Sequence, residues 1–342
     1  MNDICKIKDR ETMININRIQ AQLAYWHMRN IVKKRPLDIN IETTTICPMR
    51  CRFCCNRLYQ REQQVMGVEL FEKIVMQFFE WGGVLGIGSM QSDFLSDPLL
   101  LERIEIIKKY KKKLWLHSTT PLISAGRYNE NEFYDIITCF NSLEISVEGY
   151  DRESYLELAG IDGFETFCKQ IERLKKIIDQ HSLNLDVHLS FRTFNKEKLM
   201  QSEFYSYLSD MFYVREVKDS FFSWFGSICS SDLPEGATLY LSDNRNKRID
   251  CAIANATLAI QANGKVVGCG CIDWLEKYCI GDVNTNTLKE IWSSSDALRF
   301  RHAFQDGSIP SICEECGLYC PVTYWKKRRL LRYRPKDGLY YW

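Results

Sequence analysis

The chain has 342 residues, of which 45% are apolar and 26% charged, a balance that excludes a disordered chain and predicts a globular protein with a large core. Its 45 lysines and arginines nearly match its 44 aspartates and glutamates, so the charge favours neither a nucleic-acid partner nor a membrane surface. No apolar run is long enough to cross a bilayer, and the charged start lacks a secretion signal, so we expect a cytoplasmic protein.

The predicted elements begin with a helical extension over residues 1–36. From residue 37 onward, short β-like runs alternate with amphipathic stretches whose apolar residues recur every three or four positions. The six predicted strands are residues 37–44, 84–91, 114–120, 143–149, 183–191 and 217–225. This alternation is typical of βα units and predicts an α/β fold, a partial (β/α)6 TIM-like barrel over residues 37–228. We expect residues 229–342 to form a small Cys-rich domain with a basic C-terminal tail.

A cysteine motif follows the first predicted strand, at the barrel edge where the loops after parallel strands carry chemistry. It places Cys47, Cys51 and Cys54 in one short loop. The chain has fifteen cysteines and five histidines, and in a reducing compartment such thiols bind metal or do redox chemistry rather than form disulfides. No histidine lies beside the cysteines, which favours all-thiolate sites for zinc or iron-sulfur clusters. Cys55 is outside this spacing, and we expect it to be a small buried residue.

Side chains alternate between the two faces of a strand, and this sorts the residues of the fourth and fifth predicted strands. Ser146 and Glu148 share one face of the fourth strand, and Ser190 and Arg192 share one face of the fifth. Each of them alone is equally well interpreted as a satisfied polar group of the core or rim. Because several converge at the ends of neighbouring strands, the pattern favours a ligand site at the barrel mouth.

A second group of cysteines lies in the C-terminal part of the chain. Cys251 and Cys269 precede the closely spaced pair Cys313 and Cys316. The run IQANGKVVGC, residues 260–269, predicts a β-hairpin with Asn-Gly at its turn that presents Cys269 at a strand end. Four thiolates of this kind hold either a structural zinc ion or an iron-sulfur cluster, and their spacing leaves both alternatives open.

The spacing Cys47-x3-Cys51-x2-Cys54, with Phe53 before the third cysteine and a strand ahead of the loop, resembles the signature of radical S-adenosylmethionine (SAM) enzymes. The resemblance implies that three thiolates hold a [4Fe-4S] cluster and leave one iron open to SAM. It also implies reductive cleavage of SAM to a 5′-deoxyadenosyl radical, which removes hydrogen from an unactivated carbon. An external electron donor such as flavodoxin or ferredoxin is implied as a partner.

The resemblance also assigns residues to SAM binding. QSDFLSDPLL takes the place of the family's GGEP-like turn, so Asp93 stands where the family has an acidic residue, while Gln91 and Ser92 replace its two glycines. The other residues that the resemblance assigns are Ser118 near the third-strand threonine, Ser146 and Glu148 near the ribose, and Ser190 and Arg192 near the carboxylate. A guanidinium suits a carboxylate because it can pair through two parallel hydrogen bonds.

The C-terminal cysteines resemble the auxiliary-cluster extension of the superfamily, in its shorter twitch form rather than the full SPASM form. The resemblance implies one auxiliary [4Fe-4S] cluster whose ligands are Cys251, Cys269, Cys313 and Cys316. The cysteines left over are Cys271, Cys279 and Cys320. A further cluster on these three departs from the family's pattern, because the gap between Cys316 and Cys320 is shorter than the full SPASM form requires.

Relatives with a twitch extension include aminocyclitol dehydrogenases, and this resemblance implies oxidation of a sugar or aminocyclitol alcohol. Peptide maturation is an alternative, because related SPASM enzymes modify peptides. Epimerisation is another, and it needs a thiol hydrogen donor, for which Cys229 and Cys271 are the candidate catalytic residues. A zinc or cluster scaffold without catalysis is the remaining alternative, and the polar strand ends count against it.

Overall fold

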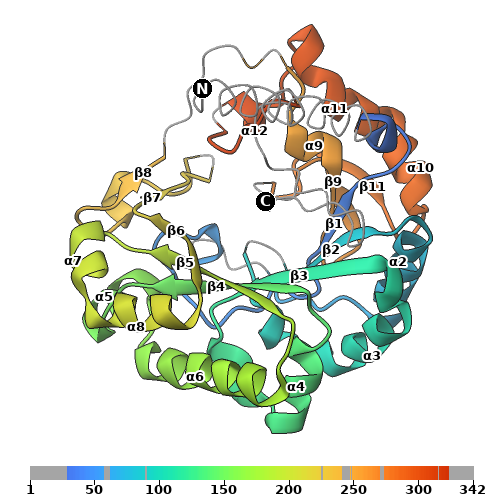
Figure 1. Ribbon diagram of the computed structural model, residues 1–342. Helices are drawn as coiled ribbons and strands as arrows, with labels where there is room; N and C mark the ends of the chain where they lie inside the picture. The colour runs from blue at the N-terminus through green and yellow to red at the C-terminus, as the bar shows by residue number, and fades with distance from the viewer. Residues whose placement is uncertain are drawn as a thin grey trace, which may run out of the picture.

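The computed structural model describes residues 29–57, 62–88, 91–224, 226–240, 247, 249–269, 273–314 and 316–322 (Figure 1). Most of the predicted helical extension and the basic tail lie outside the described residues. No helix within the described ranges is both long and apolar enough to cross a membrane.

Six parallel strands follow one another in chain order and form the curved sheet at the centre of the fold (Figure 1). They are β1 (Asp38–Ile41), β2 (Gly83–Ile87), β3 (Leu114–Thr120), β4 (Ser142–Glu148), β5 (Asp186–Arg192) and β6 (Tyr213–Lys218). Their order confirms the predicted α/β fold, a partial (β/α)6 TIM-like barrel with helices on the outside.

The helices between the strands cover the convex face of this sheet (Figure 1). They are α2 (Val68–Trp81), α3 (Leu100–Tyr110), α4 (Glu130–Ile137), α5 (Arg152–Ala159), α6 (Phe164–His181), α7 (Lys196–Gln201) and α8 (Glu203–Met211). In α6 the apolar residues Phe167, Ile171 and Leu174 recur at helical spacing and are completely buried. Helix α5 begins at a capping box in which Asp151 accepts a hydrogen bond from the Ser154 amide. The core therefore lies between sheet and helices, and the opposite face of the sheet lines the barrel lumen.

The C-terminal part continues the same sheet instead of forming a separate one. Strand β9 (Thr257–Ile260) pairs parallel with β1, and the sheet continues through β10 (Lys265–Val267) and β11 (Cys279–Asp282) in antiparallel pairing. The turn between β9 and β10 contains Gly264 at a φ of 90°, a conformation that favours glycine, which confirms the predicted hairpin. The remaining helices of this part are α9 (Ala252–Ala256), α10 (Leu288–Ser293), α11 (Ser295–Asp306) and α12 (Ser311–Glu314).

The position predicted for the sixth strand, residues 217–225, is wrong. Strand β6 ends at Lys218, and Ser220–Phe221 belongs to the short strand β7, which pairs with β8 (Thr238–Leu239). The charged residues Arg215 and Glu216 interrupt the apolar pattern of residues 213–218, so the sequence did not indicate a strand there. Both lie in β6, an edge strand, where charged side chains are tolerated. The apolar residues Phe221 and Trp224, which follow it, pack against Phe53 and Cys55 instead of forming the strand.

Candidate active site

The cysteine loop after β1, residues 43–57, is tied to helix α5. The amides of Arg50 and Arg52 donate to the carbonyls of Ala159 and Leu158, at 2.9 and 3.0 Å. The Arg50 guanidinium donates back to the carbonyl of Cys47 at 3.0 Å, which fixes the first cysteine. These hydrogen bonds fix the conformation of a loop that is mostly without regular secondary structure.

The three cysteines of the motif lie among the polar residues expected around them. Cys51 is buried, while Cys47 and Cys54 are half-buried. Burial, followed by the charge of Asp93, raises the pKa of Cys47, and burial followed by the charge of Glu148 raises the pKa of Cys51. The pKa of Cys54 is lowered, chiefly by a hydrogen bond from the neighbouring thiol. Three thiols gathered at one strand end are a donor set that fits an iron-sulfur cluster, whose iron ions offset the cost of burying thiolates.

The lumen beside the cysteine loop carries a carboxylate and a guanidinium on neighbouring strands. The register places Ser146 opposite Ser190 and Glu148 opposite Arg192. The Arg192 Nη1 atom lies 3.9 Å from Glu148 Oε1 and donates to the Ser190 carbonyl at 3.2 Å. Glu148 is 2% exposed, and its Oε2 has no hydrogen-bond partner. Burial raises the pKa of Glu148, against the opposing charge of Arg192.

Phe53 connects the cysteine loop to this pair. Its ring lies 5.8 Å from the Arg192 guanidinium and stacks on Phe221 with a centroid distance of 4.5 Å. Its carbonyl accepts a hydrogen bond from Trp224 Nε1 at 2.8 Å. The Ser190 hydroxyl donates to Glu216 on β6 at 2.8 Å. The structure therefore brings Phe53, Glu148 and Arg192 together at one end of the barrel, with Ser146 and Ser190 as the preceding pair on the same face of β4 and β5.

Asp93 lies at the start of η2 (Phe94–Ser96), and its carboxylate is already occupied by protein donors. It accepts from the Thr120 hydroxyl at 2.8 Å and from the Leu95 amide at 3.3 Å. Ser118 does not reach the lumen, because it is in register with Leu143 on the face that packs against the helices. It donates instead to the Ile87 carbonyl. Thr120, on the same face at the end of this strand, donates to Asp93 and was not singled out from the sequence.

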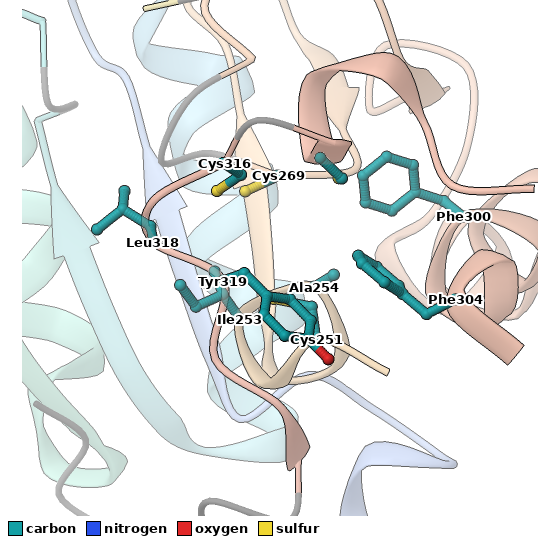
Figure 2. Close-up of a pocket in the computed structure, with 10 residues that line it drawn as sticks. Cys251, Ile253, Ala254, Cys269, Phe300, Phe304, Cys316, Leu318 and Tyr319 are labelled. Atoms are coloured by element: carbon teal, nitrogen blue, oxygen red, sulfur yellow. The ribbon is translucent and has the colours of Figure 1, made fainter. Parts of the chain in front are cut away.

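The four predicted auxiliary ligands, Cys251, Cys269, Cys313 and Cys316, all line one small cavity. Figure 2 shows the sulfur atoms of Cys269 and Cys316 pointing toward one another. Burial, followed by the charge of Cys269, raises the pKa of Cys316 to about 12. Within the described ranges, no three His, Cys, Asp or Glu side chains lie close enough together to hold a single metal ion. Four cysteines within an otherwise apolar and aromatic lining fit a cluster, which occupies the space between its ligands.

Comparison with known protein families identifies the family whose members carry two such cysteine sites. The pattern of the Radical SAM superfamily matches residues 41–202, and that of SPASM, an iron-sulfur cluster-binding domain, matches residues 251–317. The chain belongs to the radical SAM superfamily. Its first match spans β1 to α7 with the cysteine loop, and its second spans all four auxiliary cysteines. No match was found among curated proteins.

Several solved structures share this fold. BtrN in complex with AdoMet and 2-DOIA has a TM-score of 0.52 at 14% identity, over 83% of this chain and 93% of that one. The anSMEcpe structure with AdoMet and the Cp18Cys peptide has a TM-score of 0.55 at 13% identity, over 89% and 92%. SuiB of Streptococcus suis bound to S-adenosylmethionine has a TM-score of 0.50 at 14% identity, over 86% and 75%. At these identities the likeness establishes the fold.

The other cysteines that the sequence singled out in this radical SAM protein have different surroundings. Cys55 is completely buried in a small apolar core, which confirms the expectation. Cys279 is exposed on β11, and its thiol contacts the Gly281 carbonyl at 3.2 Å. Cys320 is half-buried, and neither of these two cysteines lines the auxiliary cavity. Cys229 is exposed at the start of η5 (Ser230–Asp232). Cys271 lies outside the described residues.

A buried arginine on α3 also contributes to the site, and sequence reasoning missed it. Arg103 is 0% exposed and pairs with Asp97 at 2.8 Å. Its Nη2 group also reaches the carbonyls of Thr43, at the start of the cysteine loop, and of Met66, just before α2. A signal was present in the sequence, because Arg103 occupies an apolar position in the repeat of α3, next to Ile104.

Proposed function

We propose that this radical SAM enzyme cleaves SAM reductively and oxidises a sugar or aminocyclitol alcohol to a ketone. The observation that carries the proposal is the pair of separate cysteine sites on one continuous sheet, one at the barrel mouth and one around the auxiliary cavity. The fold shared with BtrN, solved with AdoMet and 2-DOIA, supports a small polar substrate. We expect one auxiliary [4Fe-4S] cluster, and a cytoplasmic donor such as flavodoxin or ferredoxin.

In this proposal the residues of the barrel mouth have separate tasks. Cys47, Cys51 and Cys54 hold the first cluster, and Arg192 pairs with the carboxylate of SAM. Glu148 offers its unpartnered, buried Oε2 to a ribose hydroxyl, which would supply the donor that this oxygen lacks. When bound, the first cluster and SAM would supply an electron and a carbon-centred radical, and a cluster held by the auxiliary cysteines would supply an electron acceptor.

Oxidation accounts for the second cysteine site better than the alternatives do. An alcohol that becomes a ketone loses two hydrogens, one to the adenosyl group and one as a proton and an electron. The cavity of Cys251, Cys269, Cys313 and Cys316 is where an acceptor for that electron would be held. Epimerisation would need a thiol inside the site, but Cys229 is exposed. Peptide modification remains the second candidate, because the chain also shares its fold with anSMEcpe, solved with a peptide.

The first test is iron content and SAM cleavage after anaerobic reconstitution. We expect about eight irons per chain, two clusters' worth, and cleavage on reduction. The triple variant Cys47→Ala, Cys51→Ala, Cys54→Ala should lose cleavage and keep about four irons. Cys55→Ala is the matched control, because it changes the adjacent cysteine outside the motif spacing. Undiminished cleavage in the triple variant would rule out the proposed function.

The second test distinguishes oxidation from epimerisation once a substrate is in hand. In deuterated water, oxidation gives a product two hydrogens lighter than the substrate by mass spectrometry. An isomer with one carbon-bound deuterium, lost in Cys229→Ala or Cys271→Ala, would establish epimerisation instead.

A further inference from the structure

A buried lysine contacts the loop that carries Cys313 and Cys316. Lys247 is 5% exposed, and its ammonium donates to the carbonyls of Cys313 and Glu314 at 2.7 Å each and of Cys316 at 3.0 Å. An ammonium group has three N–H donors, so these three acceptors match its capacity. All three carbonyls belong to one turn at the end of α12, and the lysine is more than sixty residues away in the chain.

A lysine in this position needs a physical reason, because lysines are almost never fully buried without compensation. Carbonyl oxygens at the end of a helix carry partial negative charge and give part of that compensation. The ammonium also lies 5.7 Å from the ring of Tyr319, which lines the auxiliary cavity. The lysine is therefore placed behind the cysteine pair, between their backbone and an aromatic wall of the cavity.

The position of Lys247 has two consequences for the cysteines. Three hydrogen bonds fix the carbonyls of Cys313, Glu314 and Cys316, and so fix how both thiols enter the cavity. The ammonium also places a positive charge against the backbone of both cysteines and beside Tyr319, a residue of the cavity wall. A fixed positive charge beside a cluster favours its reduced form, which carries one more negative charge.

We propose that Lys247 is a positioning residue of the auxiliary site that holds the Cys313–Cys316 turn and makes the bound cluster a better electron acceptor. The inference rests on the proposed ligand set and deepens the proposed function, because an acceptor is what alcohol oxidation requires. A tenfold change in the equilibrium between oxidised and reduced cluster corresponds to about 59 mV for one electron. The effect is therefore measurable as a midpoint potential without any substrate.

The experiment uses the full chain with the triple change Cys47→Ala, Cys51→Ala, Cys54→Ala, so that only auxiliary iron remains. In this background, Lys247→Met removes charge and donors, Lys247→Gln keeps donors without charge, and Lys247→Arg keeps both. Lys265→Met is the matched control, because Lys265 on β10 is exposed and pairs with Glu276 at 3.0 Å. Iron per chain and the midpoint potential in an EPR-monitored redox titration are the two readouts.

We expect the potential to fall in Lys247→Gln and to stay near that of the parent in Lys247→Arg and Lys265→Met. Lys247→Met should lose iron or show the lowest potential, with an unchanged far-UV circular dichroism spectrum. Parental iron and potential in both Lys247→Met and Lys247→Gln would overturn the proposal. If the parent holds no auxiliary iron, the proposed function fails instead, so the two failures are distinguishable.

Discussion

At the scale of single residues, the distance between Arg192 and Glu148 determines what the barrel mouth can bind. At 3.9 Å the two charges attract each other but form no hydrogen bond, so each keeps capacity for a ligand. The Arg192 guanidinium faces the Phe53 ring and contacts the Ser190 carbonyl, which restricts its orientation. This arrangement suits a ligand that carries both a carboxylate and hydroxyl groups.

Arg192→Lys is expected to weaken SAM binding although the charge is kept. A lysine cannot offer the planar fork that pairs with a carboxylate through two bonds, so we expect about a tenfold loss of affinity. Equilibrium binding of SAM to the reconstituted enzyme measures it. Arg215→Lys is the control, since Arg215 pairs with Glu144 at 2.7 Å deeper in the lumen. Equal SAM affinity in wild type and Arg192→Lys would show that Arg192 has another task.

A second single-residue feature of the lumen is the histidine on β3. His117 is in register with Gly86, and a Cβ at Gly86 would lie 2.9 Å from His117 Nε2, so the glycine makes room for the ring. The Nε2 atom is buried without a hydrogen-bond partner. Burial, followed by the charge of Arg215, lowers the pKa of His117 from 6.5 to about 4.

This lowered pKa predicts a pH dependence of stability. The unfolded chain binds a proton at His117 below pH 6.5, while the folded chain does not until about pH 4, so folding stability is lost as the pH falls between these values. We expect His117→Gln to remove about 1 kcal/mol of the stability that is lost between about pH 7 and pH 5.5. Urea unfolding at both pH values measures this loss. His302→Gln, at an exposed position on α11, is the control, and an equal pH dependence in wild type and His117→Gln would contradict the prediction.

At the scale of secondary-structure elements, the cysteine loop is a long excursion between β1 and α2 that is closed by a third element. The Met66 amide donates to the Thr43 carbonyl at 2.9 Å where the loop closes. Arg103 on α3 reaches both of these residues and pairs with Asp97, which follows η2. One buried side chain therefore connects the loop, the Asp93 turn and α3.

Arg103→Met is expected to lower the free energy of unfolding by about 3 kcal/mol, because it leaves the Asp97 carboxylate buried without its partner. The added change Asp97→Asn should recover part of that loss, since no buried charge then remains. Denaturant unfolding of the single and double variants measures both effects. If the losses of unfolding free energy in Arg103→Met and Asp97→Asn simply add up in the double variant, the two residues are not coupled as described.

At the scale of the whole molecule, the two cysteine sites belong to one folding unit. Strand β9 of the C-terminal part pairs with β1, directly before the cysteine loop. Trp274, from the segment after Cys269, is buried in the same small core as Cys55 and Trp224. The C-terminal part therefore supports the loop that is expected to hold the first cluster.

A fragment of residues 1–228 is expected to fail to load the first cluster, although it contains all three motif cysteines. Without β9, strand β1 becomes an exposed edge of mostly buried residues, and such edges pair with other chains. We expect aggregation on size-exclusion chromatography and well below four irons per chain. A monomeric fragment with about four irons would instead show that the barrel folds independently at the predicted boundary.

The sequence by itself predicted what depends on residues close together in the chain. The spacing of Cys47, Cys51 and Cys54 places three thiols in one loop, and strand alternation placed Glu148 and Arg192 on the lumen face. Both follow from local geometry, because one strand has a period of two residues and one short loop can surround one cluster. The register in the structure then put Glu148 opposite Arg192.

Only the tertiary structure decided which distant segments meet. The pairing of β3 with β4 put Ser118 and Thr120 on the same, helix-facing side, where Ser118 donates to the Ile87 carbonyl and Thr120 donates to Asp93. Lys247 reaches a turn 66 residues away, and Arg103 reaches Thr43 60 residues away. Such contacts depend on sheet register and on the burial of charged groups among partners that are distant in the chain. The local hydrophobic periodicity of a sequence determines neither of them.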